Sequence, residues 1–249
     1  MNIRKSTSLW KVFLAIPLAL VIGGFDFWAE SLPWEVQQLL VNSIYGAMKI
    51  DGLSSYLSIM QRLAFVLVFN ILYANEISNH FRNSCVYVFS RLKTRKHWYL
   101  RKVCRLALCN FGFVCLYVSV ILIRCIARSA FPVTAGIVGF TALIIVFSFL
   151  ITFTTTLAIN LTAISWGTAR AFGLTQIVLC VFIVIFILTY RIPLLCAINP
   201  VSFLRFCSNA PWVNIGAMVM NILLAVGIAG KGMAFIEQFD VSLFDPEND

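Results

Sequence analysis

Residues 133–161 read VTAGIVGFTALIIVFSFLITFTTTLAINL, a run of 29 positions without one charged side chain. A helix needs about 20 mostly apolar residues to cross the roughly 30 Å hydrocarbon core of a membrane. The apolar residues are continuous rather than alternating, which favours a helix over a strand of a membrane barrel. The run therefore predicts a transmembrane helix, and its extra length predicts that the helix tilts, bends or projects from the membrane.

Five further apolar stretches qualify by the same measure, and they lie near residues 12–28, 57–74, 103–123, 173–190 and 213–229. A cleaved signal peptide is the alternative for the first stretch, but residues 25–29 offer no small-x-small cleavage site, so we expect it to remain as a span. The sequence thus predicts an all-α integral membrane protein with six transmembrane helices in a single domain, residues 1–249.

The composition excludes the soluble alternatives. Hydrophobic residues make up 61% of the 249 positions and charged residues 12%, and the mean hydropathy is +0.92. An ordinary soluble domain is about half apolar and about a quarter charged, because its surface must carry polar groups. A soluble enzyme, a soluble nucleic-acid-binding protein and a disordered linker are therefore poor interpretations.

The basic residues predict the orientation of the chain. With the N-terminus in the cytoplasm, 13 of the 19 Lys and Arg residues fall on the inner side and 6 on the outer side. This distribution follows the positive-inside rule and places both termini in the cytoplasm. The net charge of +9 then reflects topology and contact with lipid, and no nucleic-acid partner is implied.

The eight cysteines and two histidines do not form the pattern of a metal site. No C-x-x-C pair occurs, so we expect no structural zinc. Cys196 and Cys207 lie in one outer loop, where either a disulfide or two free thiols fits the pattern.

The motifs do not assemble into a catalytic site. The sequence contains neither H-E-x-x-H nor G-x-S-x-G. Residues 227–232, which read GIAGKG, resemble a phosphate loop only faintly, because Gly232 stands where a Ser or Thr would bind magnesium. We interpret this run as a helix end. We expect no catalytic residues, no metal and no cofactor in this chain, which is not an enzyme by itself.

The polar side chains well inside the predicted spans are uncharged. The candidates for a substrate path or for helix packing are Asn70, Asn110, Thr152, Thr155 and Asn160. Hydrogen bonds inside a membrane are worth about 0.6–2 kcal/mol each, so helix packing is the first interpretation. Without a buried charge relay, we expect uphill transport to take its energy from a partner.

Residues 75–102 carry the strongest indication of a partner. Together with Arg105 they hold eight of the nineteen basic residues and a single acid, Glu76. A collar that binds anionic lipid headgroups accounts for the charge, at about 1 kcal/mol per Lys or Arg. Aromatic residues such as Phe81 and Trp98 lie between the bases, and this mixture favours an interfacial helix that also docks on another protein.

The layout resembles that of the small ABC-2 type transporter permeases. Six spans in 249 residues, cytoplasmic ends and a basic loop after the second span are similar to bacterial subunits for the export of, or immunity to, antimicrobial peptides. The local match runs from Tyr87-Val88-Phe89-Ser90-Arg91 through Arg95-Lys96-His97-Trp98 to Lys102. In that family the region contains the coupling helix that docks on the ATPase. The resemblance implies a docking set of Glu76, Arg82, Arg91, Lys93, Arg95, Lys96, Trp98, Arg101 and Lys102.

Two further segments resemble parts of the same family. The lead containing Arg4, Lys5, Trp10 and Lys11 is similar to an interfacial elbow helix. Residues 191–211 are similar to a re-entrant hairpin before the last span, through Pro193, Asn199 and Pro200. The outer loop 29–56 departs from the macrolide-exporter type, because it is too short for a large outer domain.

The resemblance implies a type V exporter-like architecture and a function in transport. The chain would be the permease subunit of an ABC exporter that moves an amphipathic peptide, a lipid or an antimicrobial compound out of the bacterial plasma membrane. A separate ATPase dimer would bind ATP and magnesium, and a second permease subunit, identical or related, would complete the path. The alternative is a non-transporting immunity or scaffold protein that binds a toxin or a partner complex.

Overall fold

The computed structural model describes residues 10–22, 40, 44, 63–79, 95–128, 136–189, 191–202 and 211–238. The elements within these residues are η2 (Lys11–Leu14), α2 (Ala15–Ile22), α5 (Ala64–Tyr73), α7 (Arg95–Arg128), α8 (Gly136–Trp166), α9 (Thr168–Thr189), α10 (Pro193–Ile198) and α11 (Pro211–Gln238). All of them are helices, so the predicted all-helical fold is confirmed for this part of the chain.

Four helices, α7, α8, α9 and α11, are long and apolar enough to cross a membrane. α7 has 34 residues and α8 has 31. At 1.5 Å per residue these helices are about 51 Å and about 46 Å long, against roughly 30 Å of hydrocarbon. The protein is therefore embedded in a membrane. α2 and α5 have only 8 and 10 residues, and they lie within the predicted spans 12–28 and 57–74.

The outside of the bundle is apolar, as contact with lipid requires. Large hydrophobic side chains are exposed on each of the four long helices, among them Leu108, Val138, Leu188 and Val226. Helices that are hydrophobic on all sides are typical of membrane spans.

Two of the long helices extend beyond their predicted ends. α7 begins at Arg95 rather than near residue 103, because Tyr99, Val103 and Leu106 continue its buried face through the basic turns. α11 continues to Gln238 rather than ending near residue 229, and Ile236 is fully buried in its last turns. The interpretation of residues 227–232 as a helix end is therefore wrong.

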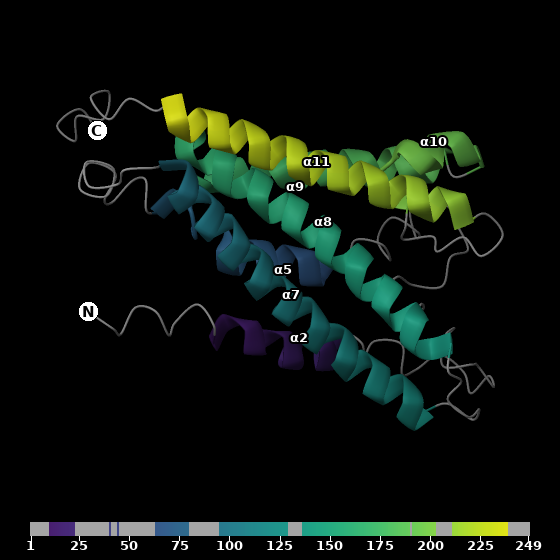
Figure 1. Ribbon diagram of the computed structural model, residues 1–249. Coiled ribbons are helices and arrows are strands. Elements are labelled where there is room, and N and C mark those ends of the chain that lie inside the picture. Colours follow the sequence, from purple (N-terminus) through teal and green to yellow (C-terminus); the bar gives the residue numbers. More distant parts are fainter. Residues whose placement is uncertain are drawn as a thin grey trace.

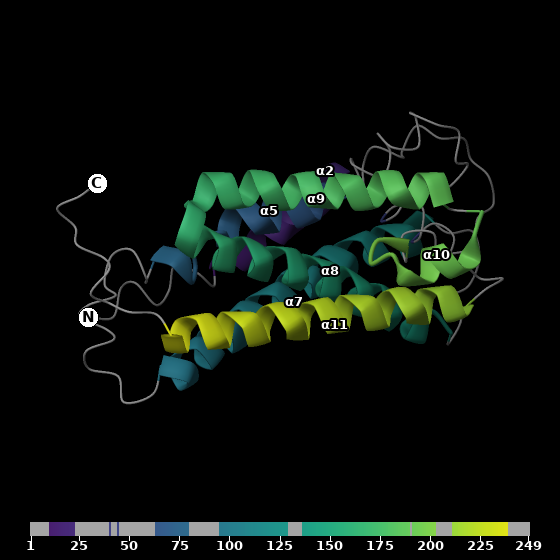
Figure 2. The same cartoon turned by 90° about the horizontal axis from the view of Figure 1, so that it is seen from above.

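α7 and α8 pack side by side through the middle of the bundle (Figure 1). η2 and α2 pack along α7, and α5 contacts α2, α7 and α8. α9 and α11 pack against α8, and α10 lies between these two helices near one end of the bundle (Figure 2). We call the opposite end, where η2 and α7 begin and α8 and α11 end, the basic end. It carries Lys11, Arg95, Lys96, Arg101 and Lys102.

An aromatic seam joins α5 to α7. Phe65 stacks on Tyr117 with ring centroids 4.9 Å apart, and the Phe69 centroid lies 5.1 Å from that of Phe113. All four rings are buried, and such ring pairs add about 0.5–1.5 kcal/mol beyond the area that they bury. The seam fixes the position of α5 along α7, and it therefore fixes where the end of α5 lies relative to α7.

A single residue, Gly167, separates α8 from α9. Its φ of 80° lies in the left-handed region, which glycine adopts without a steric penalty. The Gly167 amide donates to Ala163 O at 3.1 Å, and its carbonyl accepts from the Ala171 amide at 3.1 Å. The same residue thus ends one helix and begins the next, which places the start of α9 beside the end of α8.

Candidate functional site

The candidate site begins where α5 ends, at Tyr73. The last carbonyls of an α-helix have no partner within the helix and need one from elsewhere. Lys11 Nζ donates to Leu72 O at 2.8 Å and lies 5.5 Å from the centroid of the Tyr73 ring. A cation at a helix C-terminus is also favoured by the helix dipole. Lys11 therefore ties the start of η2 to the end of α5.

Asn160 of α8 supplies the next contacts. Its Nδ2 donates to Tyr73 O at 2.8 Å, and its Oδ1 accepts from the Ile77 amide at 2.8 Å. Asn160 and Ile77 are fully buried, so water does not compete for these bonds. One side chain thus bridges the turn 74–77 that follows α5.

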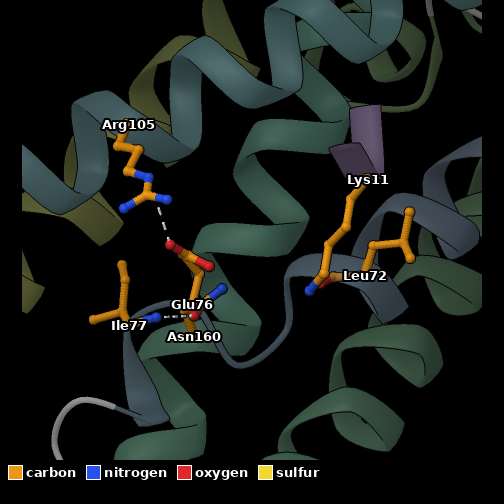
Figure 3. A network of polar contacts seen from close by, with 6 residues as sticks. All are labelled: Lys11, Leu72, Glu76, Ile77, Arg105 and Asn160. Carbon is orange, nitrogen blue, oxygen red and sulfur yellow. Dashed lines mark hydrogen bonds and ion pairs between the residues drawn. The ribbon is translucent and has the colours of Figure 1, made fainter. Parts of the chain in front are cut away.

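Two more helices reach the same turn. Arg105 Nε of α7 lies 3.7 Å from Glu76 Oε1, and the two side chains are 35% and 17% exposed. Thr168 Oγ1 at the start of α9 donates to Asn75 Oδ1. We call residues 72–77, together with Lys11, Arg105, Asn160 and Thr168, the polar junction. Figure 3 shows Arg105 directed at Glu76, Lys11 beside Leu72 and Asn160 beside Ile77.

Hydroxyl groups of α8 extend the polar junction towards the middle of α5. Asn70 Oδ1 accepts from Thr156 Oγ1 at 2.6 Å and from Thr155 Oγ1 at 3.3 Å. Asn160 Nδ2 also donates to Thr156 O at 2.9 Å, so the two asparagines share one threonine. Asn110 lies apart from this group, because its Nδ2 donates to Phe149 O of α8 at 2.9 Å.

The polar residues predicted inside the spans therefore divide into two kinds. Asn70, Thr155 and Asn160 come together at the α5–α8 contact, where their hydrogen bonds join the two helices. Thr152 Oγ1 donates to Ser148 O within α8, at 2.7 Å. Hydrogen bonds of the first kind hold two helices together and are worth about 0.6–2 kcal/mol each. The Thr152 bond satisfies its own hydroxyl within one helix.

The predicted docking residues that the structure describes lie in two places. Glu76 belongs to the polar junction. Lys96 Nζ pairs with Glu237 Oε1 of α11 at 2.9 Å, and Lys102 Nζ lies 5.9 Å from the Trp98 ring centroid. The first turns of α7 carry Arg95, Lys96, Trp98, Arg101 and Lys102. The other docking residues, Arg82, Arg91 and Lys93, lie outside the described residues.

The predicted elbow is described only from Trp10 onward, and Arg4 and Lys5 lie outside the described residues. Trp10 is 70% exposed, with its ring centroid 5.8 Å from that of Phe13. An exposed Trp next to a Lys is typical of a helix that begins at a membrane interface. Lys11 is the elbow residue that enters the polar junction.

The described part of the predicted re-entrant loop, residues 191–202, lies between α9 and α11. Asn199 Nδ2 donates to Phe182 O at 2.9 Å, and Asn221 Nδ2 donates to Pro200 O at 2.7 Å. Phe182 lies seven residues before the end of α9, which is about 10 Å along the helix axis. The chain around Pro200 therefore runs back alongside these helices. Pro193 begins α10, where its missing N–H is not needed.

Sequence reasoning did not single out Thr168 or Asn221. Asn221 carries the same signal as Asn70, an amide within a predicted span, and could have been found. Thr168 carries no such signal, because its contact with Asn75 depends on the fold. A Cβ on Gly216 would lie 2.7 Å from Ala197 O, so the glycine allows α10 and α11 to touch.

The polar junction is suited to holding helices together. In the part of the chain that the structure describes, no three His, Cys, Asp or Glu side chains come together to hold a metal ion. Comparison with protein-family models, with curated proteins and with solved structures finds no match. Function must therefore be inferred from the residues and their geometry.

Proposed function

We propose that the chain is the membrane-spanning permease subunit of an ABC exporter, with six transmembrane helices in an ABC-2 type arrangement. A separate ATPase dimer binds ATP and magnesium on the cytoplasmic side, and a second permease subunit completes the path. The cargo is an amphipathic peptide, a lipid or an antimicrobial compound that leaves the bacterial plasma membrane.

The observation that carries the proposal is how residues 75–102, the region that resembles the family's coupling region, are attached to the helix bundle. At its start, Arg105 contacts Glu76 and Asn160 binds the Ile77 amide. At its end, residues 95–102 form the first turns of α7. A force applied to this region therefore reaches α7 and α8, as ATP-driven rocking of the spans requires.

The distribution of basic residues supports docking of the ATPase at the basic end of the bundle. Lys11, the bases of the first turns of α7, Arg170 and Lys231 belong to the basic half of the bundle. Cytoplasmic segments carry an excess of Lys and Arg. Exposed Arg101 offers a charge to a partner, and Trp98 offers an aromatic group of the kind that is enriched in docking surfaces.

The segment around α10 supports a transporter with a structured outer end. Irregular backbone at membrane depth occurs only where protein or a water-filled cavity satisfies its polar groups. Asn199 and Asn221 make such contacts with α9 and with the carbonyl of Pro200. These bonds favour a re-entrant element over a loop in water.

Purification of the tagged protein in a mild detergent, followed by mass spectrometry and an ATPase assay of the eluate, tests the proposal. We expect an ATPase with phosphate-loop motifs to co-elute. The Arg95→Ala/Trp98→Ala variant should lose both the co-elution and the coupled ATP turnover. Arg101→Glu is a second variant, because reversing the charge of an exposed side chain changes docking with little effect on the fold.

Trp166→Ala combined with Arg170→Ala is the control for residue type, whereas Arg101→Glu avoids the packing of half-buried Trp98 against the core. The control also removes one Trp and one Arg from the basic end, and both are exposed, but they lie outside the predicted docking set. This control should retain the ATPase. Equal retention by all variants would show that the docking residues are wrongly assigned. If the protein elutes alone, or with a peptide and no ATPase, transport gives way to the immunity or scaffold function.

A further inference from the structure

Four different helical elements contact five of the six residues 72–77 at the end of α5. The contacts are Leu72 with Lys11 of η2, Tyr73 and Ile77 with Asn160 of α8, Asn75 with Thr168 of α9, and Glu76 with Arg105 of α7. The turn is therefore the place where these elements meet.

The turn has few backbone bonds of its own. The Glu76 amide donates to Tyr73 O at 3.2 Å, and the Asn79 amide donates to Asn75 O at 3.1 Å. Both bonds are local, so they shape the turn without fixing its place in the bundle. That place depends on the side chains of the polar junction, on Tyr73 and Ile77, which are buried in the main hydrophobic core, and on a small apolar cluster. The cluster, which is separate from the main core, contains Ala74, Ile159, Ala163 and Ala171.

The geometry favours contacts that form and break together. Asn160 makes hydrogen bonds at both ends of the turn, with Tyr73 O and with the Ile77 amide. A shift of the turn therefore breaks both bonds at once. These groups are buried, and a buried polar group that loses its partner gains no water in exchange. Contacts within one hydrogen-bonded network are also coupled in energy.

We propose that the polar junction is a cooperative joint that locks η2, α7, α8 and α9 to residues 72–77, so that the loss of one contact loosens the others. Its use rests on the proposed function, because the joint would carry a movement of the docking region to four elements together. Its existence does not depend on an ATPase. Asn160 is the main positioning residue, since it makes two of the contacts and shares Thr156 with Asn70.

Hydrogen exchange of the full chain in lipid nanodiscs, read by mass spectrometry, tests the joint. Asn160→Leu is compared with Asn110→Leu, which also removes a fully buried asparagine from a contact between two helices. We expect Asn160→Leu to speed exchange about tenfold or more in three separate segments: the start of η2, residues 72–79 and the start of α9. Asn110→Leu should change exchange only near Asn110 and Phe149.

Lys11→Met is the second variant, because it removes the bond to Leu72 O and the charge beside the Tyr73 ring and spares the buried core. The joint predicts faster exchange at Ile77 and at Thr168, although Lys11 touches neither. If the change stays at Leu72 in Lys11→Met, the contacts are independent and the proposal is overturned, whether or not Asn160→Leu folds. The absence of a co-eluting ATPase would overturn the proposed function and leave this exchange pattern unchanged. The two failures are therefore distinguishable.

Discussion

Replacing Gly216 with alanine should disrupt the packing of α10 against α11. A Cβ on Gly216 would lie 2.7 Å from Ala197 O and 2.9 Å from Ala197 Cβ. Both distances are well below the contact distance of about 3.5–4.0 Å between carbon atoms. The clashing atoms belong to a helix backbone and its Cβ, which cannot turn away as the end of a long side chain can. Overpacking of this kind costs about 1–3 kcal/mol.

Gly227→Ala is the matched control for this substitution. Gly227 also lies within α11, and a Cβ on it would have no atom within 4 Å. Both substitutions gain helix propensity, by up to about 1 kcal/mol. The difference between the two variants therefore isolates the clash with Ala197.

Cys196 provides the assay, because it lies in α10 and is only 2% exposed. Its Sγ donates to Thr189 O at 3.4 Å, so the thiol becomes accessible when α10 leaves its seat. With Cys196 as the single cysteine, a loss of 1–3 kcal/mol should speed thiol labelling about 5- to 150-fold, since 1.4 kcal/mol is a factor of ten. Equal labelling rates for Gly216→Ala and Gly227→Ala would refute the reasoning, because the clash would then have no effect on α10.

Three further predictions concern stability and are checked by thermal unfolding in detergent. Arg124→Leu should destabilise the protein by about 1.5–3 kcal/mol, because Arg124 Nη1 donates to a carbonyl of α2 at 2.8 Å; an unchanged midpoint would contradict this. Gly232→Ala should lower the midpoint, since its Cβ would lie 2.7 Å from a leucine of α8 and against the Tyr99 hydroxyl. Tyr99→Phe should restore part of that loss, because this buried hydroxyl has no hydrogen-bond partner among the described residues. Lys96→Ala should cost less than about 1 kcal/mol, since its ion pair with Glu237 is about half-exposed, and a larger loss would show that the pair has a structural role.

The long helices could be predicted from the sequence because their apolar character does not depend on their neighbours. The run 133–161 lies almost entirely within α8, Gly136–Trp166, since a membrane helix is apolar on its lipid face and on its packed face. The start of α7 was harder to predict. Its basic residues hide the buried positions Tyr99, Val103 and Leu106, whose spacing of three to four is a helical signal.

The polar junction could not be assembled from the sequence, although several of its members stood out as polar residues. Lys11 lies 61 residues before Leu72, and Ile77 lies 83 residues before Asn160. Nothing in a single sequence pairs such positions, because the pairing follows from the height of α5 along α7. The left-handed turn at Gly167, which brings Thr168 to the polar junction, depends equally on the packing of α8 and α9.

The length of α7 makes the helix a lever. Its 34 residues extend for about 51 Å, so about 20 Å of the helix projects beyond a hydrocarbon core of roughly 30 Å. A tilt of about 10° about its midpoint moves each end by about 4 Å, which is close to the width of one side chain. A small rotation at the Arg95 end would therefore displace Arg124, and with it the end of α2, in the opposite direction.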